Sequence, residues 1–160
     1  MISIPGAAFI MPDDFDRVIR DLARCDGAAI VGALDEKNAR KLAFSEFGTK
    51  TAPPRPTLSV ITDRLAPTID RKIRREIGSV LDGKGRGVTG REIVAEVARD
   101  LAEEVRNAID GNTPPPLAAS TIAKRRARGN PSTRTLVDTG EMMRSIDVRT
   151  SDDPRAFGRE

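Results

Sequence analysis

The chain has 160 residues, enough for one domain and too few for two full cores. It has no histidine and one cysteine, Cys25, which excludes a His-based catalytic triad, histidine metal ligands, an internal disulfide framework and a cysteine-rich zinc site. Its 27 basic and 24 acidic residues give a formal net charge of +3, short of the clustered positive field of a dedicated nucleic-acid binder.

Aromatic side chains are scarce: the chain has five Phe and neither Trp nor Tyr. The core must therefore be aliphatic, and its margin over chain entropy is thin, since each buried large side chain contributes roughly 1.5–3 kcal/mol. Assembly with further copies would widen that margin. No apolar run approaches the ~20 residues that span a bilayer, and the start lacks the basic region of a signal peptide. We expect no membrane contact and assembly in a cytoplasm.

The first third of the chain predicts a helix, a strand and a second helix. Residues 12–14, a proline followed by two aspartates, begin the first helix. Residues 28–34 form a short apolar run that indicates a buried strand. Asp35 can cap the second helix, and Gly48 ends it. The expected inner faces are Phe15, Val18, Ile19 and Leu22, with a stop at Gly27, and then Ala39, Leu42, Ala43 and Phe47.

The most informative stretch is residues 44–56. After Gly48 come three prolines in residues 49–56, which we call the proline strap, and Arg55 stands between two of them. Because proline fixes its own φ and forces the preceding residue out of the helical region, the strap is predicted to be stiff and non-helical. Such a segment suits contact with another surface better than catalysis. The candidate assembly contacts are Glu46, Phe47, Gly48, Thr49, Pro53, Pro54, Arg55 and Pro56.

Two long amphipathic helices are predicted next, as an antiparallel pair. The first carries Pro67 inside its pattern, where a kink or a fresh start is expected. Residues 89–92 fit a capping box that begins the second, and Gly111 ends it. The apolar stripes are Leu58, Ile61, Leu65, Ile69, Ile73, Ile77 and Leu81, and then Ile93, Val97, Leu101, Val105 and Ile109.

The last part of the chain reads as short elements separated by turns. We expect a rigid break at residues 113–116, a basic helix over 120–128, a turn at 129–131, a stretch around 136–137, a short helix near 139–145 and a strand around 146–148. The fold class is therefore α+β, with a small antiparallel sheet packed with two long amphipathic helices and shorter helices. Residues 1–150 form a single domain, and residues 151–160 a polar flexible tail.

Two basic segments are candidates for contact with a partner or DNA. Residues 83–87 include Lys84 and Arg86, but no Ser or Thr follows the lysine, so this is no Walker loop and reads as a mobile hairpin tip. The other candidates lie on the expected basic helix, where a solvated face is an equal alternative: Lys124, Arg125, Arg126 and Arg128. Without Tyr or Trp for base stacking, the form of DNA binding that remains is contact with the phosphate backbone, without sequence preference.

Asp138, Thr139 and Gly140 match the Asp-Thr-Gly of retroviral-type aspartic proteases, in which two chains each supply one carboxylate. Those enzymes need a flap and further strands after the triplet, and here 20 residues follow Gly140. The alternative is a structural cap, because Asp and Thr cap well and a short helix is expected to begin at Gly140. A dimeric aspartic protease is therefore a remote alternative, and no catalytic residue, metal or cofactor is expected.

Two blocks of sequence in combination carry a resemblance to a known family. The blocks are Glu46-Phe47-Gly48-Thr49 with Pro53-Pro54-Arg55-Pro56, and Pro116-Leu117 with Ser120-Thr121 and Lys124, then Leu136-Val137-Asp138-Thr139-Gly140 and Ser145-Ile146. In this order and spacing the chain resembles the neck and tail-completion proteins of tailed bacteriophages, described as minor tail, neck or virion-morphogenesis proteins, over about residues 28–148. It departs from them at Met142 or Met143, where Leu is usual, and at Thr57, where a bulky apolar residue is common.

The resemblance implies a structural subunit of the head-to-tail connection and no chemistry. Copies of the chain would form a closed ring, expected to be hexameric, that joins the DNA-filled head to the tail and leaves an axial channel for phage DNA. Its partners would be the neighbouring connector or adaptor and the tail-terminator or tail-tube proteins, and its location the virion. A basic nucleic-acid-associated protein is the alternative. Whether Arg55 contacts a neighbouring subunit or its own chain stays open.

Overall fold

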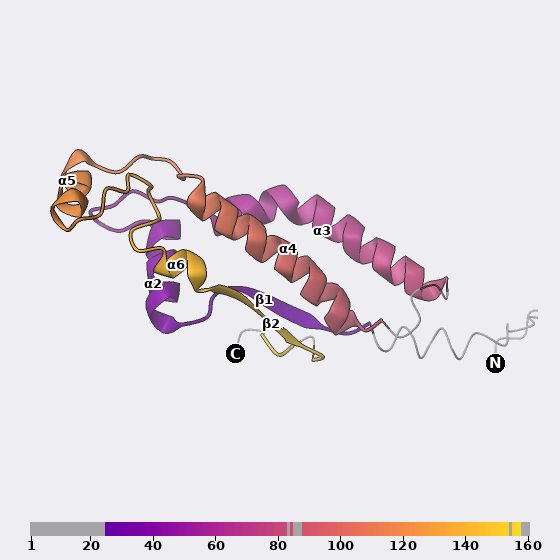
Figure 1. The fold of residues 1–160 in the computed structure, drawn as a ribbon. Coiled ribbons are helices and arrows are strands. Elements are labelled where there is room, and N and C mark those ends of the chain that lie inside the picture. The colour runs from indigo at the N-terminus through magenta and orange to yellow at the C-terminus, as the bar shows by residue number, and fades with distance from the viewer. Residues whose placement is uncertain (1–24, 83, 85–87, 154, 158–160) are drawn as a thin grey trace, which may run out of the picture.

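The computed structural model describes residues 25–82, 84, 88–153 and 155–157 (Figure 1). The body of the helix expected before Gly27 lies outside these residues, as does Arg86 of the expected basic loop. The described chain has an α+β fold, as predicted. Its elements are β1 (Ala28–Ala33), α2 (Glu36–Phe47), α3 (Leu58–Leu81), α4 (Gly90–Asp110), α5 (Ala119–Ala127), α6 (Glu141–Arg144) and β2 (Ile146–Ser151).

The two strands come from opposite ends of the described chain and pair antiparallel. In their register Val31 lies opposite Val148, and Ala28 lies opposite Ser151. Both predicted strands are present, but β1 is not the buried strand that the apolar run predicted: none of its residues is buried, and Ile30 is exposed. Strand β2 runs further than expected, so Ser151, taken from the sequence as the first residue of a flexible tail, belongs to the sheet. Pairing of the first strand with the last ties the described chain into one unit.

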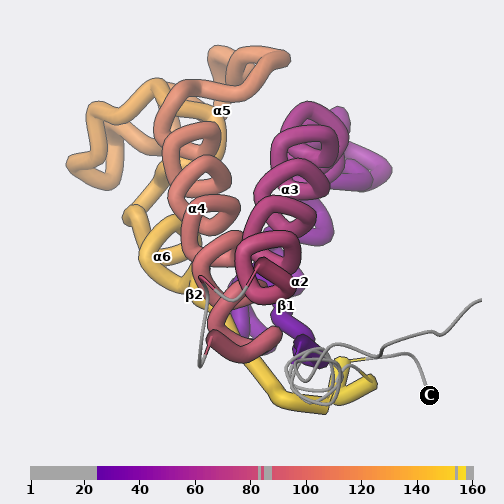
Figure 2. The backbone as a smooth tube through the Cα atoms, turned by 90° about the vertical axis from the view of Figure 1, so that its right-hand side faces the viewer, coloured from indigo at the N-terminus to yellow at the C-terminus, as the bar shows by residue number. Residues whose placement is uncertain are grey.

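Helix α4 is the central element. It packs on both strands and on α3, and Figure 2 shows α3 and α4 side by side with β1 below them. Its N-terminus is the predicted capping box, in which the Thr89 hydroxyl accepts the Glu92 N–H and the Glu92 carboxylate accepts the Thr89 N–H. Gly111 forms its C-cap, also as predicted. Because strands and a helix cover it on different sides, α4 contributes the largest share of buried residues among the described elements.

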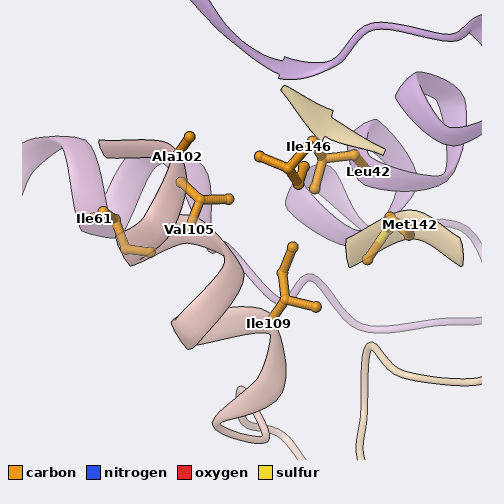
Figure 3. Packing of buried hydrophobic residues seen from close by; sticks show 7 residues of the cluster. All are labelled: Leu42, Ile61, Ala102, Val105, Ile109, Met142 and Ile146. Atoms are coloured by element: carbon orange, nitrogen blue, oxygen red, sulfur yellow. The ribbon is translucent and has the colours of Figure 1, made fainter. Parts of the chain in front are cut away.

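The core is aliphatic, as the composition requires. Its residues come from five elements and meet where α4 crosses the sheet, next to α2 and α6 (Figure 3). The cluster consists of Leu42, Ile61, Ala102, Val105, Ile109, Met142 and Ile146. Ile109 and Ile146 are among its most completely buried members, so the end of α4 and the start of β2 fix the position of α6 between them.

Helix α3 runs through Pro67 as one helix, so of the two outcomes expected there, a kink or a fresh start, the fresh start does not occur. Its stripe is only partly buried, with Ile61 and Val80 the buried residues of the helix and Leu81 exposed. The reason is that α3 packs mainly on α4, and one neighbour cannot cover a stripe that turns around a helix of 24 residues.

The predicted inner face of α2 is wrong at its C-terminal end. Leu42 is buried, but Phe47 is 81% exposed and Ala43 is exposed too. The helix contacts β1 and α6, while its last turn projects beyond them (Figure 1). The periodicity therefore placed the helix correctly and misjudged how far the core extends along it.

Candidate assembly site

The carboxylate of Glu46 caps helix α3 from the end of helix α2. Its Oε2 accepts the backbone N–H groups of Thr57 at 2.7 Å and Leu58 at 3.0 Å, and its Oε1 accepts the N–H of Ser59 at 2.9 Å and its hydroxyl. The first turn of a helix has N–H groups without intrahelical partners, and the side chain of the N-cap residue Thr57 makes no capping bond. Glu46 supplies the missing acceptor. Local capping patterns do not find it, because it lies eleven residues upstream.

Burial and hydrogen bonding act on Glu46 in opposite directions. Partial burial favours the neutral acid, but the Ser59 hydroxyl and the N–H groups of Thr57, Ser59 and Leu58 favour the carboxylate and together lower its pKa. The group is therefore ionised at neutral pH. A negative charge at the positive end of the α3 dipole adds to the stabilisation.

The proline strap folds back on the end of α2 and is non-helical, as predicted. The Arg55 N–H donates to the Ser45 carbonyl oxygen at 2.6 Å, and the Thr49 N–H donates to that of Ala52 at 2.9 Å. The turn requires Gly48, which has φ of +74°; a Cβ there would lie 2.9 Å from the Pro54 nitrogen. The strap is thus a closed loop whose two ends meet.

Arg55 contacts its own chain. Its Nε donates to the Pro115 carbonyl oxygen at 2.8 Å, and its Nη2 donates to that of Pro116 at 3.2 Å. Pro115 and Pro116 lie between α4 and α5, outside any helix or strand, so their carbonyl oxygens can accept these hydrogen bonds. These bonds join the strap to residues 113–116, the expected rigid break, whose last residue begins the second block of sequence. The sequence left open whether Arg55 contacts a neighbouring subunit or its own chain. In the single chain its guanidinium contacts its own chain.

A set of ion pairs joins α2 to α6. Lys37 and Lys41 donate to the two carboxylate oxygens of Glu141 at 2.7 and 3.1 Å. Hydrogen bonds from these ammonium groups lower the pKa of Glu141 to about 2. All three side chains are well exposed, so the pairs orient the helices more than they stabilise them.

Arg125 does not face a partner or DNA, which corrects its assignment from the sequence. Its side chain is buried, and its Nη1 donates to the carbonyl oxygens of Arg134 at 2.7 Å and Val137 at 3.0 Å. A run of basic letters cannot reveal this, because the acceptors lie on a loop 9 to 12 residues later. The neighbouring Lys124 and Arg126 are exposed and stay candidates, as does Lys84.

Asp138 is not the helix cap that the sequence suggested. Its Oδ1 accepts the Asn130 Nδ2–H at 2.6 Å and lies 3.4 Å from the Arg125 Nε, and its Oδ2 lies 3.6 Å from the Arg128 Nη2. The carboxylate thus holds the loop to α5. Arg128, expected to face outward, is partly neutralised by it.

Thr139 and Gly140 do lie at the start of α6. The Thr139 hydroxyl accepts the Glu141 N–H at 3.4 Å, a long bond, and Gly140 is the N-cap with φ of +73°. A Cβ at Gly140 would lie 2.7 Å from the Arg144 guanidinium, whose Nη2 donates to the Thr139 carbonyl oxygen at 3.0 Å. The residues of the Asp-Thr-Gly triplet therefore have structural roles in this chain: Asp138 holds the loop to α5, and Thr139 and Gly140 form the start of α6.

Two of the five phenylalanines are exposed beside the strap. Phe44 is 59% exposed and Phe47 81% exposed, both on the last turns of α2. A shallow groove of about 450 Å³, lined by Lys37, Arg40, Lys41 and Phe44 among others, lies on the same helix. We call Phe44 and Phe47 the phenylalanine pair. It provides apolar surface next to a rigid loop, an arrangement suited to contact with another protein.

In the described part of the chain, no three His, Cys, Asp or Glu side chains cluster so that they could hold a metal ion. None of the helices described is long and apolar enough to cross a membrane. The chain matches no protein-family model, and neither a curated protein nor a solved structure is significantly similar to it.

Proposed function

We propose that the chain is a structural subunit of the phage head-to-tail connection, a neck or tail-completion ring that joins the DNA-filled head to the tail and leaves an axial channel for DNA. One observation supports this above the others. The two sequence blocks that carry the resemblance lie about 60 residues apart, and Arg55 of the first donates to Pro116, the first residue of the second, and to Pro115 directly before it. These bonds hold the start of the second block against the first in one structural unit, as expected if both serve one purpose.

The surface of that unit favours assembly over chemistry. Phe44 and Phe47 are exposed on a helix whose end is held by the strap and by Glu46, so their position is fixed before any partner arrives. Single exposed apolar residues are common, but two neighbouring aromatics on a rigid end are a better docking surface. If this patch binds a different surface of the next copy, each copy is rotated relative to the one before. The copies form a ring when these rotations add up to a full turn.

The partners in this proposal are copies of the chain, the neighbouring connector and tail proteins, and the DNA that passes through. Lys84, Lys124 and Arg126 are exposed and could meet phosphate groups without reading sequence. The Asp138 carboxylate lies near the Arg125 guanidinium and accepts a hydrogen bond from the Asn130 amide. These contacts within the chain argue against the aspartic-protease alternative, in which two carboxylates share a proton.

The test is to inactivate the gene in the phage or prophage that encodes this chain and to image the particles. We expect DNA-filled heads and separate tails in place of joined virions, and joining restored when the wild-type chain is supplied in trans. Normal yields of joined virions would refute the proposal. Tight DNA binding by a purified monomer, falling steeply with salt, would favour the nucleic-acid alternative instead.

A further inference from the structure

A groove lies between the middle turns of α3 and α4, on a different surface from the phenylalanine pair. Its volume is about 390 Å³, and we call it the α3–α4 groove. Its apolar floor comes from both helices and consists of Leu65, Ile69, Val97 and Leu101. All of these side chains except Val97 are only partly buried by the described residues. The groove therefore offers apolar surface that another protein surface can cover.

The rim of the α3–α4 groove is acidic. Asp100, Glu103 and Glu104 of α4 line it together with Lys72 of α3, so these residues carry a formal charge of −2, from three carboxylates and one ammonium group. The ammonium group of Lys72 lies 2.6 Å from the Asp100 carboxylate and is already engaged. Glu103 pairs with none of the described cations, and its exposed charge is available to a partner.

One face of α2 has the opposite charge. Its members recur at i, i+3, i+4 and i+7 and therefore share one side of the helix: Lys37, Arg40, Lys41 and Phe44. They line the shallow groove on this helix together with Glu36, so this lining carries a formal charge of +2, from three cations and one carboxylate. Phe47 continues the same side, three residues after Phe44. This α2 face thus combines exposed aromatic rings with a cationic surround.

We propose that the α2 face of one copy docks into the α3–α4 groove of the next copy, with Phe44 against the apolar floor and the cations towards the acidic rim. This inference rests on the ring proposed above and names the two surfaces that meet in it. Opposite charges then face each other, whereas contact of two α2 faces or of two grooves would bring like charges together. The contact is therefore heterologous, the kind from which rings are built.

The ion pairs that each surface makes within its own chain leave both signs unchanged. Glu141, which binds Lys37 and Lys41, reduces the charge of the α2 face to +1, from three cations and two carboxylates. Arg64 pairs with Glu104 and Glu96 pairs with Lys72, so these two partners cancel and the groove keeps its charge of −2. The two surfaces remain complementary in the folded chain.

A second copy is the occupant because the two surfaces cannot meet within one chain. Helix α2 packs on β1 and α6, and its C-terminal end is fixed by Glu46 and by the strap. The groove lies at the middle of the α3–α4 pair, while α2 lies at one end of that pair (Figure 1). A rigid helix held at that end reaches the groove of another copy and not its own.

Sedimentation velocity of the purified full chain tests the contact. Phe44→Ser removes the inserted ring, and Thr68→Arg places a long cation at the groove, which the exposed Thr68 lines. Each variant should weaken self-association at least about tenfold. The matched controls should associate as the wild type does: Val60→Ser, 55% exposed against 59% for Phe44, and Ala66→Arg, exposed on α3 and not part of the groove lining. A wild-type chain that stays monomeric would overturn the proposal, as would equal effects of variants and controls.

Mixing the two impaired variants distinguishes a heterologous contact from a symmetric one. The Phe44→Ser chain keeps an intact groove, and the Thr68→Arg chain keeps an intact α2 face. An equimolar mixture should therefore form a one-to-one dimer and nothing larger. A mixture that stays monomeric would overturn the proposal.

Imaging of phage particles reports on the ring function separately from this contact. If joined virions require the chain while both variants associate as the wild type does, the ring function stands and the proposed contact is wrong. If the variants and their mixture behave as expected while joined virions form without the chain, the contact stands and the head-to-tail function is wrong.

Discussion

The Glu46 carboxylate accepts the backbone N–H of Thr57 at 2.7 Å, and this bond connects the last turn of one helix to the first turn of the next. The residues between them close into the proline strap, which Gly48 permits and Arg55 fastens to residues 113–116. The end of α2 is held rigidly in consequence. Phe44 and Phe47 are displayed on an element that has little freedom left to lose on binding.

Glu46→Ala should lower the free energy of unfolding by about 1–2 kcal/mol at pH 7, because the first N–H groups of α3 lose their acceptor. Glu103→Ala, an exposed change on α4, should stay within about 0.5 kcal/mol. The folded-state pKa of Glu46 is lowered, so its stabilisation is present above the usual value of 4.5 and is lost as pH falls through the folded pKa. Urea titrations at several pH values measure this. A difference that persists undiminished at pH 2 would contradict the capping role.

Arg125→Ala should cost about 2–4 kcal/mol, because among the described residues the Arg134 carbonyl oxygen loses its donor and the Val137 carbonyl oxygen keeps only the Ser132 hydroxyl. Arg126→Ala, next in the chain and exposed, is the matched control and should be nearly neutral. Thermal and urea unfolding report the difference. Equal stability of the two variants would return Arg125 to the exposed basic residues.

Arg55→Ala should loosen the strap while the core stays folded, because the guanidinium bonds only to two loop carbonyls and is partly exposed. We expect a loss of about 1 kcal/mol and faster amide exchange at Thr49 and Arg55. Arg55→Lys can restore one bond and not both, so its exchange rates should be intermediate. Global unfolding of Arg55→Ala would show instead that the strap is part of the core.

Phe47→Ser should leave the unfolding free energy within about 0.5 kcal/mol of the wild type, since the side chain is 81% exposed. If the phenylalanine pair is an assembly contact, the same variant should fail to restore joined virions when supplied in trans. Leu81→Ser is the control, an exposed apolar residue at the far end of α3, and it should restore joining. Full rescue by Phe47→Ser would remove the pair from the proposed interface.

Local signals in the sequence were sufficient for most elements of the fold. The capping box at Thr89, the stop at Gly111, the strand expected at residues 28–34 and the non-helical strap all depend on neighbouring residues. All are found, the strand over residues 28–33. The candidate site was less predictable. The motif identified Glu46 and Arg55 as candidates, but the sequence did not predict their hydrogen-bond partners. It also predicted a buried Phe47, an outward-facing Arg125 and a helix cap at Asp138, and these three predictions are wrong.

By itself, the sequence determined where elements begin and end and that the core is aliphatic, because capping, backbone restriction by Pro and Gly, and composition act over a few residues. Only the tertiary structure decided which charges are buried and which apolar residues are left outside. Arg125 is buried since a loop 9 to 12 residues away brings carbonyl oxygens to it, and Phe47 is exposed since the core ends before the last turn of α2. Burial depends on what packs against a residue, and periodicity along one element does not contain that information.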